Sequence, residues 1–114
     1  MKIHNMNLNP SPFEMIKSGR KTIELRLFDE KRQQIKVGDG IVFTNTLTKE
    51  TLSTTVVGLH KFDSFYELYD NLPLLKCGYT EEDIGKANPR DMEQYYSPAE
   101  QKKYGVVGIE LTLI

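Results

Sequence analysis

Residues 51–62, TLSTTVVGLHKF, restrict the possible folds of this chain more than any other segment. They are rich in β-branched residues and long enough for an extended strand. The segment GIVFTN, residues 40–45, precedes them after a short polar connection, so we expect the two to pair as an antiparallel hairpin. Since helices do not regularly separate the strand-like segments, a doubly wound parallel sheet is disfavoured.

Shorter elements flank this hairpin. Apolar residues alternate in residues 3–8, which predicts a strand, and residues 11–19 predict a helix capped by Ser11 and ended by Gly19. Capping-box patterns predict helices after Ser64 and Ser97, and a proline predicts another from Pro89. Strands are expected at residues 22–27 and at the C-terminal segment YGVVGIELTLI. This order predicts an α+β fold, a small mixed β-barrel with short helices covering its ends.

Length and composition narrow the function classes. A chain of 114 residues is expected to form a single domain, residues 1–114, without a separate cofactor domain. With 15 basic and 16 acidic residues the net charge is -1, so a polyanion would have to meet a local patch. Cys77 is the only cysteine, which excludes an internal disulfide and a multi-cysteine metal cluster. Without an apolar signal region or a membrane-length apolar run, we expect a cytoplasmic protein with no membrane partner.

The strand at residues 22–27 carries an unusual amount of charge. Strict alternation places Thr22, Glu24 and Arg26 on one face. One interpretation is a solvated face with a surface ion pair worth about 0 to 1 kcal/mol. The other is a cleft in which this face, with Lys21 beside it, converges on a ligand. In that cleft Lys21 would meet a phosphate or act as a base, which requires burial or a cationic neighbour such as Arg20 or Arg26 to favour its neutral form.

The segment SGRKTIELRLFDEKRQQIKVGDGIVFTN resembles the signature of the ASCH family. The family pattern is a glycine, a lysine, a glutamate and an arginine at fixed spacing, followed by a turn of the form hydrophobic-Gly-Asp. Here the corresponding residues are Gly19, Lys21, Glu24, Arg26 and Val37-Gly38-Asp39. The C-terminal segment MEQYYSPAEQKKYGVVGIELTLI is similar to the small single-domain bacterial and archaeal members.

This resemblance implies a PUA-like β-barrel whose cleft is lined by the motif and binds RNA or a modified nucleoside. It implies no metal and no cofactor. One branch of the family hydrolyses N4-acetylcytidine with a lysine and, three residues later, a threonine nucleophile. Lys21 matches that lysine, but Glu24 stands at the threonine position, so the threonine mechanism does not transfer. Other members cleave RNA, with catalytic groups that have no assigned counterpart in this chain.

Other residues were weighed as ligand contacts. Tyr104 is a candidate for stacking on a base beside the closing strand, with Tyr79, Tyr95 and Tyr96 less favoured. His4 and His60 would need a third ligand to bind a metal, so no metal site is expected. Cys77 has no base placed by a motif and is expected to be an idle thiol.

Two functions therefore remain open. The first is binding of single-stranded RNA or a nucleotide, with Gly19, Arg20, Lys21, Thr22, Glu24, Arg26 and Tyr104 as candidate ligand-binding residues. The second is a small hydrolase acting on a modified nucleoside such as N4-acetylcytidine, or on RNA, with Lys21 and Glu24 as catalytic groups. Whether the protein is an enzyme is left undecided by the sequence, because the residue that separates the two functions is Glu24 itself.

Overall fold

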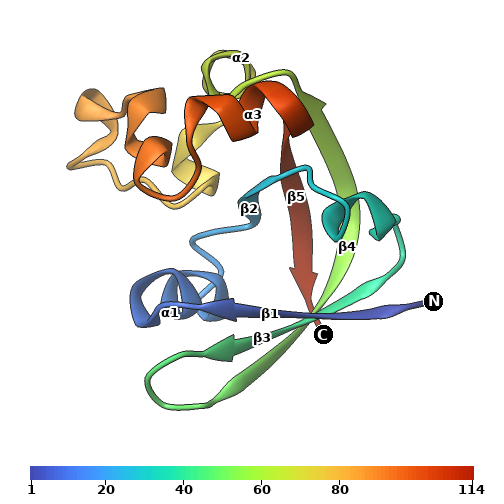
Figure 1. The fold of residues 1–114 in the computed structure, drawn as a ribbon. Helices are drawn as coiled ribbons and strands as arrows, with labels where there is room; N and C mark the ends of the chain where they lie inside the picture. Colours follow the sequence, from blue (N-terminus) through green and yellow to red (C-terminus); the bar gives the residue numbers. More distant parts are fainter.

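Five strands form one strongly curled sheet in the computed structural model, which describes residues 1–114 (Figure 1). The strands are β1 (Ile3–Leu8), β2 (Ile23–Leu27), β3 (Gly40–Asn45), β4 (Thr51–Phe62) and β5 (Val106–Leu113). Their order in the sheet is β1-β3-β4-β5-β2, with β1 and β3 parallel and every other pair antiparallel. The predicted mixed barrel of the α+β class is confirmed.

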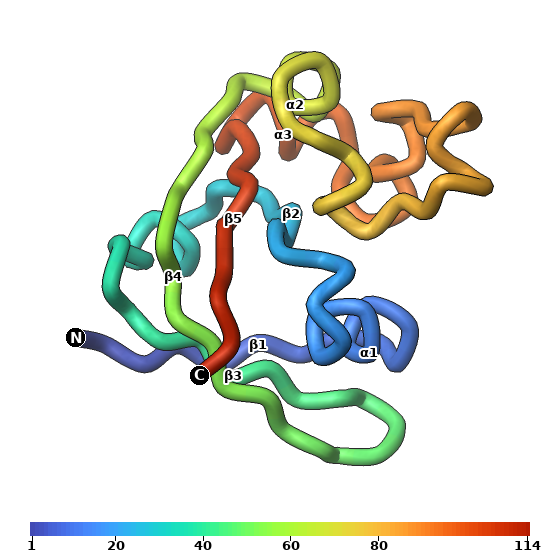
Figure 2. Tube along the Cα trace, turned by 180° about the vertical axis from the view of Figure 1, so that it is seen from behind, coloured from blue at the N-terminus to red at the C-terminus, as the bar shows by residue number.

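The long strand β4 explains the curl of the sheet. Residues 51–55 of β4 pair with β3 as the predicted hairpin, and residues 54–62 pair with β5. The register with β5 shifts between Val56 and Gly58, and such bulges bend a strand and increase its twist. In Figure 2 the strand bends around the molecule, with β5 between it and β2.

A seam without strand pairing separates the two edge strands, β1 and β2. Side chains cross it: Arg26 Nη2 donates to the carbonyl oxygen of Asn7 at 3.0 Å, and Lys31 Nζ donates to that of Asn5 at 3.1 Å. These bonds satisfy two carbonyl groups of β1 outside the ladder, and charged side chains of this kind protect a sheet edge from pairing with another chain. Arg26 therefore links the two sides of the half-open barrel.

The apolar core consists of two clusters on either side of β5. One cluster packs helix α1 (Pro10–Lys17) against β1, β3, β4 and β5, with Phe13 and Ile16 as the helix residues that are buried. The other packs β2 against helix α2 (Phe65–Asn71) and the segment that follows it. Because Ile23, Leu25 and Leu27 belong to the second cluster, alternation along β2 turns Glu24 and Arg26 toward the opposite face, as predicted.

The remaining helical segments are short. Residues 72–97, called the insert below, contain three 3-10 turns, Leu74–Lys76, Ile84–Lys86 and Pro89–Gln94, and lead into helix α3 (Pro98–Tyr104). Figure 1 shows the insert projecting to one side of the barrel. The capping box of Ser97 and Glu100 is present as predicted, and Ser64 accepts from the backbone N–H of Glu67 at 3.3 Å.

The predicted start of the first helix was wrong. Helix α1 begins at Pro10 with Asn9 as its N-cap, not with Ser11 as the cap; Pro10 and Pro12 both suit the first turn of a helix, so the proline alone does not choose between the two starts. The helical segment predicted from Pro89 begins there and is a 3-10 helix. None of the helices has the length and apolar character needed to cross a bilayer.

Candidate functional site

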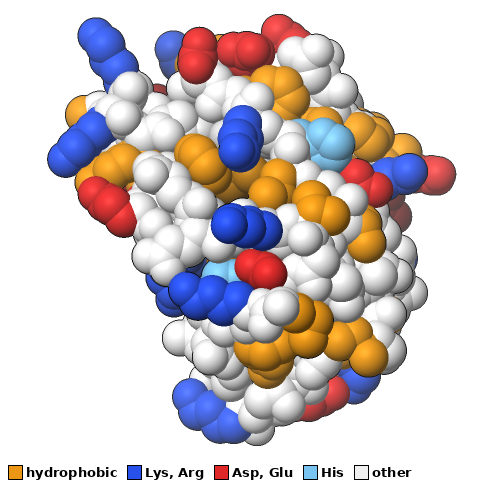
Figure 3. All heavy atoms as spheres, turned by 90° about the vertical axis from the view of Figure 1, so that its right-hand side faces the viewer, with side chains coloured by type: hydrophobic (Ala, Val, Ile, Leu, Met, Phe, Trp, Pro, Cys, Tyr) orange, Lys and Arg blue, Asp and Glu red, His pale blue; other side chains and the backbone are white.

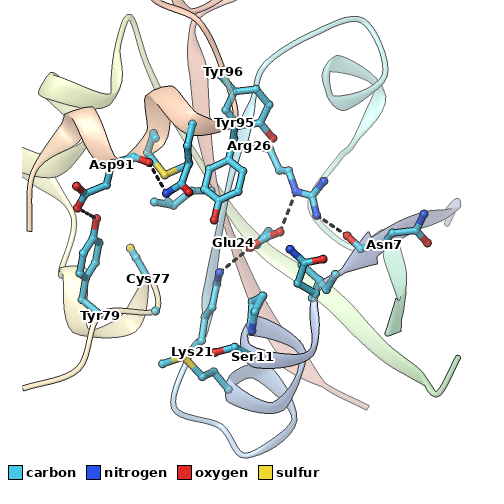
Figure 4. A pocket seen from close by; sticks show the side chains of 18 of the residues that line it. Asn7, Ser11, Lys21, Glu24, Arg26, Cys77, Tyr79, Asp91, Tyr95 and Tyr96 are labelled. Carbon is cyan, nitrogen blue, oxygen red and sulfur yellow. Dashed lines mark hydrogen bonds and ion pairs between the residues drawn. The ribbon is translucent and has the colours of Figure 1, made fainter. Parts of the chain in front are cut away.

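A cleft of about 540 Å³ lies between β2, the end of β1, helix α1 and the insert (Figure 4). Charged residues of β2 and the preceding turn form one wall, and tyrosines and Asp91 from the insert and α2 form the other. The polar and aromatic residues lining it are Asn7, Asn9, Ser11, Lys21, Glu24, Arg26, Thr46, Tyr69, Cys77, Tyr79, Asp91, Gln94, Tyr95 and Tyr96.

Glu24 is the centre of the charged wall and is only 4% exposed. Its Oε1 accepts from Lys21 Nζ at 2.8 Å, and its Oε2 accepts from Arg26 Nε, also at 2.8 Å. The guanidinium of Arg26 reaches on to Asn7 across the seam. The three motif residues thus form one connected triad, which Figure 4 shows with its ion pairs as dashed lines.

The triad keeps Glu24 ionised. Burial alone would raise the pKa of this carboxyl, but the charges of Lys21 and Arg26 and their hydrogen bonds outweigh burial and leave it below its ordinary value. Burial likewise opposes the charge of Arg26, and Glu24 more than compensates, so the pKa of the guanidinium is raised. At neutral pH the carboxylate therefore acts as an acceptor that holds two cations.

A backbone bond to α1 and close packing against the insert fix Lys21. Gly19, with φ +83°, ends the turn after α1, and the N–H of Lys21 donates to the carbonyl oxygen of Met15 at 3.0 Å. On the other side, Gly78 of the insert has φ +111°, and a Cβ at that position would lie 3.3 Å from Lys21 Cδ. The close approach of Gly78 leaves the lysine stem confined between α1 and the insert.

The opposite wall is a hydrogen-bonded row of polar groups. Tyr79 donates to Asp91 Oδ2 at 2.8 Å, so Tyr69, whose hydroxyl lies 2.6 Å from that of Tyr79, donates to Tyr79 in turn. Burial and these neighbours raise the pKa of Tyr79. The phenol therefore stays protonated and ties the insert to α2.

The candidate residues of the sequence do not all meet in the cleft. Lys21, Glu24 and Arg26 line it together, whereas Gly19, Arg20 and Thr22 are not part of its lining. Arg20 is exposed and donates to Ser18 Oγ at 3.0 Å.

Tyr104 lies at the end of α3 and lines a second hollow, with Lys103 Nζ 4.9 Å from the centre of its ring. On the face drawn in Figure 3, lysine and arginine side chains stand apart among hydrophobic and acidic ones.

The two histidines and the cysteine are engaged elsewhere or buried. His4 Nε2 donates to Asp39 Oδ2 at 2.8 Å, and His60 Nε2 lies 2.9 Å from Glu110 Oε1. No three histidine, cysteine or carboxylate side chains are grouped to hold a metal ion. Cys77 lines the cleft, but burial raises the pKa of its thiol to about 11, so at neutral pH it is protonated.

Several lining residues lacked a signal in the sequence. Asn7 and Ser11 come from β1 and α1, and Asp91 comes from a 3-10 turn of the insert. The sequence predicts Tyr95 and Tyr96 as stacking residues less strongly than Tyr104. The packing of β1, α1 and the insert around β2 brings these residues to the motif, and that packing is not visible in the sequence.

The family model for the ASCH domain matches residues 6–114. The chain belongs to the ASCH domain family. The resemblance inferred from the motif is thus confirmed, and membership supports, in general terms, an RNA-binding or hydrolase-like domain. A comparison with curated proteins finds no match.

Solved structures agree with this ASCH domain over nearly its whole length. The crystal structure of hypothetical protein PH0355 is similar at 37% identity, with a TM-score of 0.81 and all of both chains covered. The solution structure of protein PF0455 from Pyrococcus furiosus is 33% identical, with a TM-score of 0.72, covering 98% of this chain and 97% of that one. The ASCH protein from Zymomonas mobilis, 18% identical with a TM-score of 0.65, covers 97% of this chain and 67% of its own, and shares the fold.

Proposed function

We propose that residues 1–114 act as one ASCH domain that binds single-stranded RNA, or a nucleotide, in the cleft, with Lys21 as the cation that meets the ligand. The observation that carries the proposal is the position of Lys21 Nζ, which bonds Glu24 while its side chain lines the cleft. An ammonium group has three N–H donors, so two remain for oxygen or nitrogen acceptors of a ligand.

Glu24 and Arg26 act in this proposal as positioning residues. Both oxygens of Glu24 already accept from cations, and Arg26 is engaged by Glu24 and by the carbonyl of Asn7. Their shared network fixes the direction of the lysine head, and the side chains of all three residues are largely buried. Buried charge networks of this kind orient groups more than they stabilise a fold.

The hydrolase alternative, with Lys21 and Glu24 as catalytic groups, gains less support from the geometry. A general base must take up a proton during the reaction. The lowered pKa of Glu24 and its two occupied oxygens make it a weak proton acceptor. Release of cytidine and acetate from N4-acetylcytidine by the wild type, lost in both Lys21→Met and Glu24→Gln, would restore this alternative.

The binding proposal is tested by fluorescence anisotropy with labelled single-stranded RNA at low and moderate salt. Lys21→Met keeps the apolar stem, removes the charge and leaves Glu24 paired with Arg26, so the variant is expected to fold. Lys36→Ala removes the same charge from an exposed position outside the cleft and serves as the control. We expect weaker binding for Lys21→Met at both salt concentrations, because it lacks the N–H donors that would meet the ligand, and wild-type binding for the control. Equal binding by all three proteins would remove Lys21 from the site.

A further inference from the structure

The charges that line the cleft cancel. Lys21 and Arg26 supply two positive charges, and Glu24 and Asp91 supply two negative ones. A lining without net formal charge gives little attraction for the doubly charged phosphate of a nucleotide. Apolar side chains fill much of the remaining lining, among them Leu8, Pro12, Met15, Leu25 and Met92. A flat, uncharged group that offers hydrogen-bond acceptors to Lys21 fits this lining better than a phosphate does.

Three of the four tyrosine rings in the lining already pack closely against another aromatic ring. Tyr69 is buried and in edge contact with Tyr79, their ring centres 5.8 Å apart. Tyr96 is stacked on Phe65, with ring centres 6.0 Å apart and an angle of 19° between the planes. Tyr69 is buried and Tyr79 and Tyr96 are only partly exposed, so each offers less ring surface than an exposed tyrosine.

Tyr95 differs from the other three, because its side chain lines the cleft and yet remains 61% exposed. Its only ring neighbour is Tyr96, 6.5 Å away and tilted by 55°, an arrangement that leaves ring surface uncovered. In Figure 4 the ring projects into the cleft on the side of Glu24 and Arg26. An open aromatic face beside free N–H donors is the arrangement that binds an unpaired base by stacking.

We propose that a single nucleobase enters the cleft and stacks on Tyr95, with its polar edge on Lys21 and the phosphates of the strand outside. This inference rests on the proposed binding of RNA or a nucleotide at the same site, and it specifies which part of the ligand is recognised. Tyr95 is then a residue of base recognition, distinct in role from Lys21.

The test compares two labelled strands of equal length, a single-stranded RNA and a ribose-phosphate chain without bases. It uses the wild type, Tyr95→Ala, Tyr95→Phe and Tyr66→Ala. Tyr66 is a matched control, because it is 52% exposed on α2 and does not line the cleft. For RNA, Tyr95→Ala is expected to lose affinity by about 5- to 150-fold, the range for one base stacked on an aromatic ring. Tyr95→Phe and Tyr66→Ala keep the wild-type affinity, and the chain without bases binds the wild type more weakly than RNA does.

The outcomes separate this inference from the function on which it rests. If RNA binds Tyr95→Ala as well as the wild type while Lys21→Met binds weakly, base stacking is overturned and RNA binding stands. Equal binding of the two strands by the wild type also overturns base recognition. If the wild type binds neither strand, both proposals fail. Circular dichroism of Tyr95→Ala confirms that a lost affinity is not a lost fold.

Discussion

Glu24 and Asp39 are both buried carboxylates of the ASCH motif, but different parts of the chain hold them. Glu24 is 4% exposed and Asp39 is 7% exposed. Each has a partner nitrogen at 2.8 Å, and each has a pKa below its ordinary value. Burial and charge alone do not distinguish them, so their roles follow from the kind of donor that each one accepts.

Backbone groups provide most of the donors to Asp39. It accepts from the N–H of Lys2 at 3.2 Å and of Lys36 at 3.1 Å, as well as from His4. These bonds join the beginning of β1 to the turn before β3, where Gly38 has φ +97°. Asp39 therefore fixes the start of the parallel pair β1–β3 and has no place in the lining of the cleft.

Glu24, in contrast, is held by two long side chains that border the cleft. Fixing such side chains costs conformational entropy, whereas backbone donors are already fixed by the fold. Structural support alone would therefore favour backbone donors, as at Asp39. One sequence motif therefore contains a carboxylate that shapes the chain and another that, under the binding proposal, orients side chains toward the ligand.

The largest expected effect comes from removing Glu24. Glu24→Ala leaves Lys21 and Arg26 buried without a counter-charge, and we expect the free energy of unfolding to fall by about 3 to 5 kcal/mol in urea denaturation. The control is Glu110→Ala, because Glu110 is paired with His60 at 2.9 Å but its side chain is 45% exposed. An exposed pair contributes about 0 to 1 kcal/mol. Similar losses in the two variants would show that the triad behaves as a surface pair.

We expect Asp39 to make the free energy of unfolding depend on pH in the acid range. The hydrogen bond from His4, followed by backbone bonds, lowers the pKa of Asp39 from 3.8 to about 2. The contribution of this group is present above pH 3.8 and is lost as the pH falls toward about 2, because the unfolded chain takes up its proton first. Asp39→Asn should lose this part of the pH dependence in denaturation experiments, and at neutral pH it should bind RNA as the wild type does. Weakened RNA binding in a folded Asp39→Asn protein would contradict the division of roles.

Local patterns in the sequence accounted for the framework of the fold. Alternation in residues 22–27 predicted the shared face of Glu24 and Arg26, and the capping box predicted the start of α3. Both signals depend on neighbours along the chain, which the sequence displays directly. The start of α1 was misplaced because Ser11 and Pro10 both favour a helix beginning, and only packing selects between them.

Such local patterns do not predict the wall of the cleft that the insert and α2 form. Residues 72–97 have no continuous periodicity, because they fold as 3-10 turns held by contacts with β2 and α2. The sequence favoured Tyr104 over Tyr95 as a stacking residue, because Tyr104 precedes the closing strand. Their positions differ because the insert places Tyr95 in the lining of the cleft, while α3 carries Tyr104 to the second hollow.

The smallest expected effect is a change in the pH dependence of Cys77 alkylation. Cys77 is the only cysteine and therefore reports the electrostatic field around Glu24. Burial is the main reason that the pKa of Cys77 is about 11, while the charge of Lys21 lowers it and that of Glu24 raises it. Glu24→Gln removes the raising charge and leaves that of Lys21, so the pH at which iodoacetamide alkylates Cys77 should shift downward. Asp39→Asn, a change outside the cleft, should leave it unchanged. Equal shifts in both variants would mean that the thiol reports a general loosening of the fold. A shift in Glu24→Gln alone would mean that the charges of the triad act across the space where the ligand is proposed to bind.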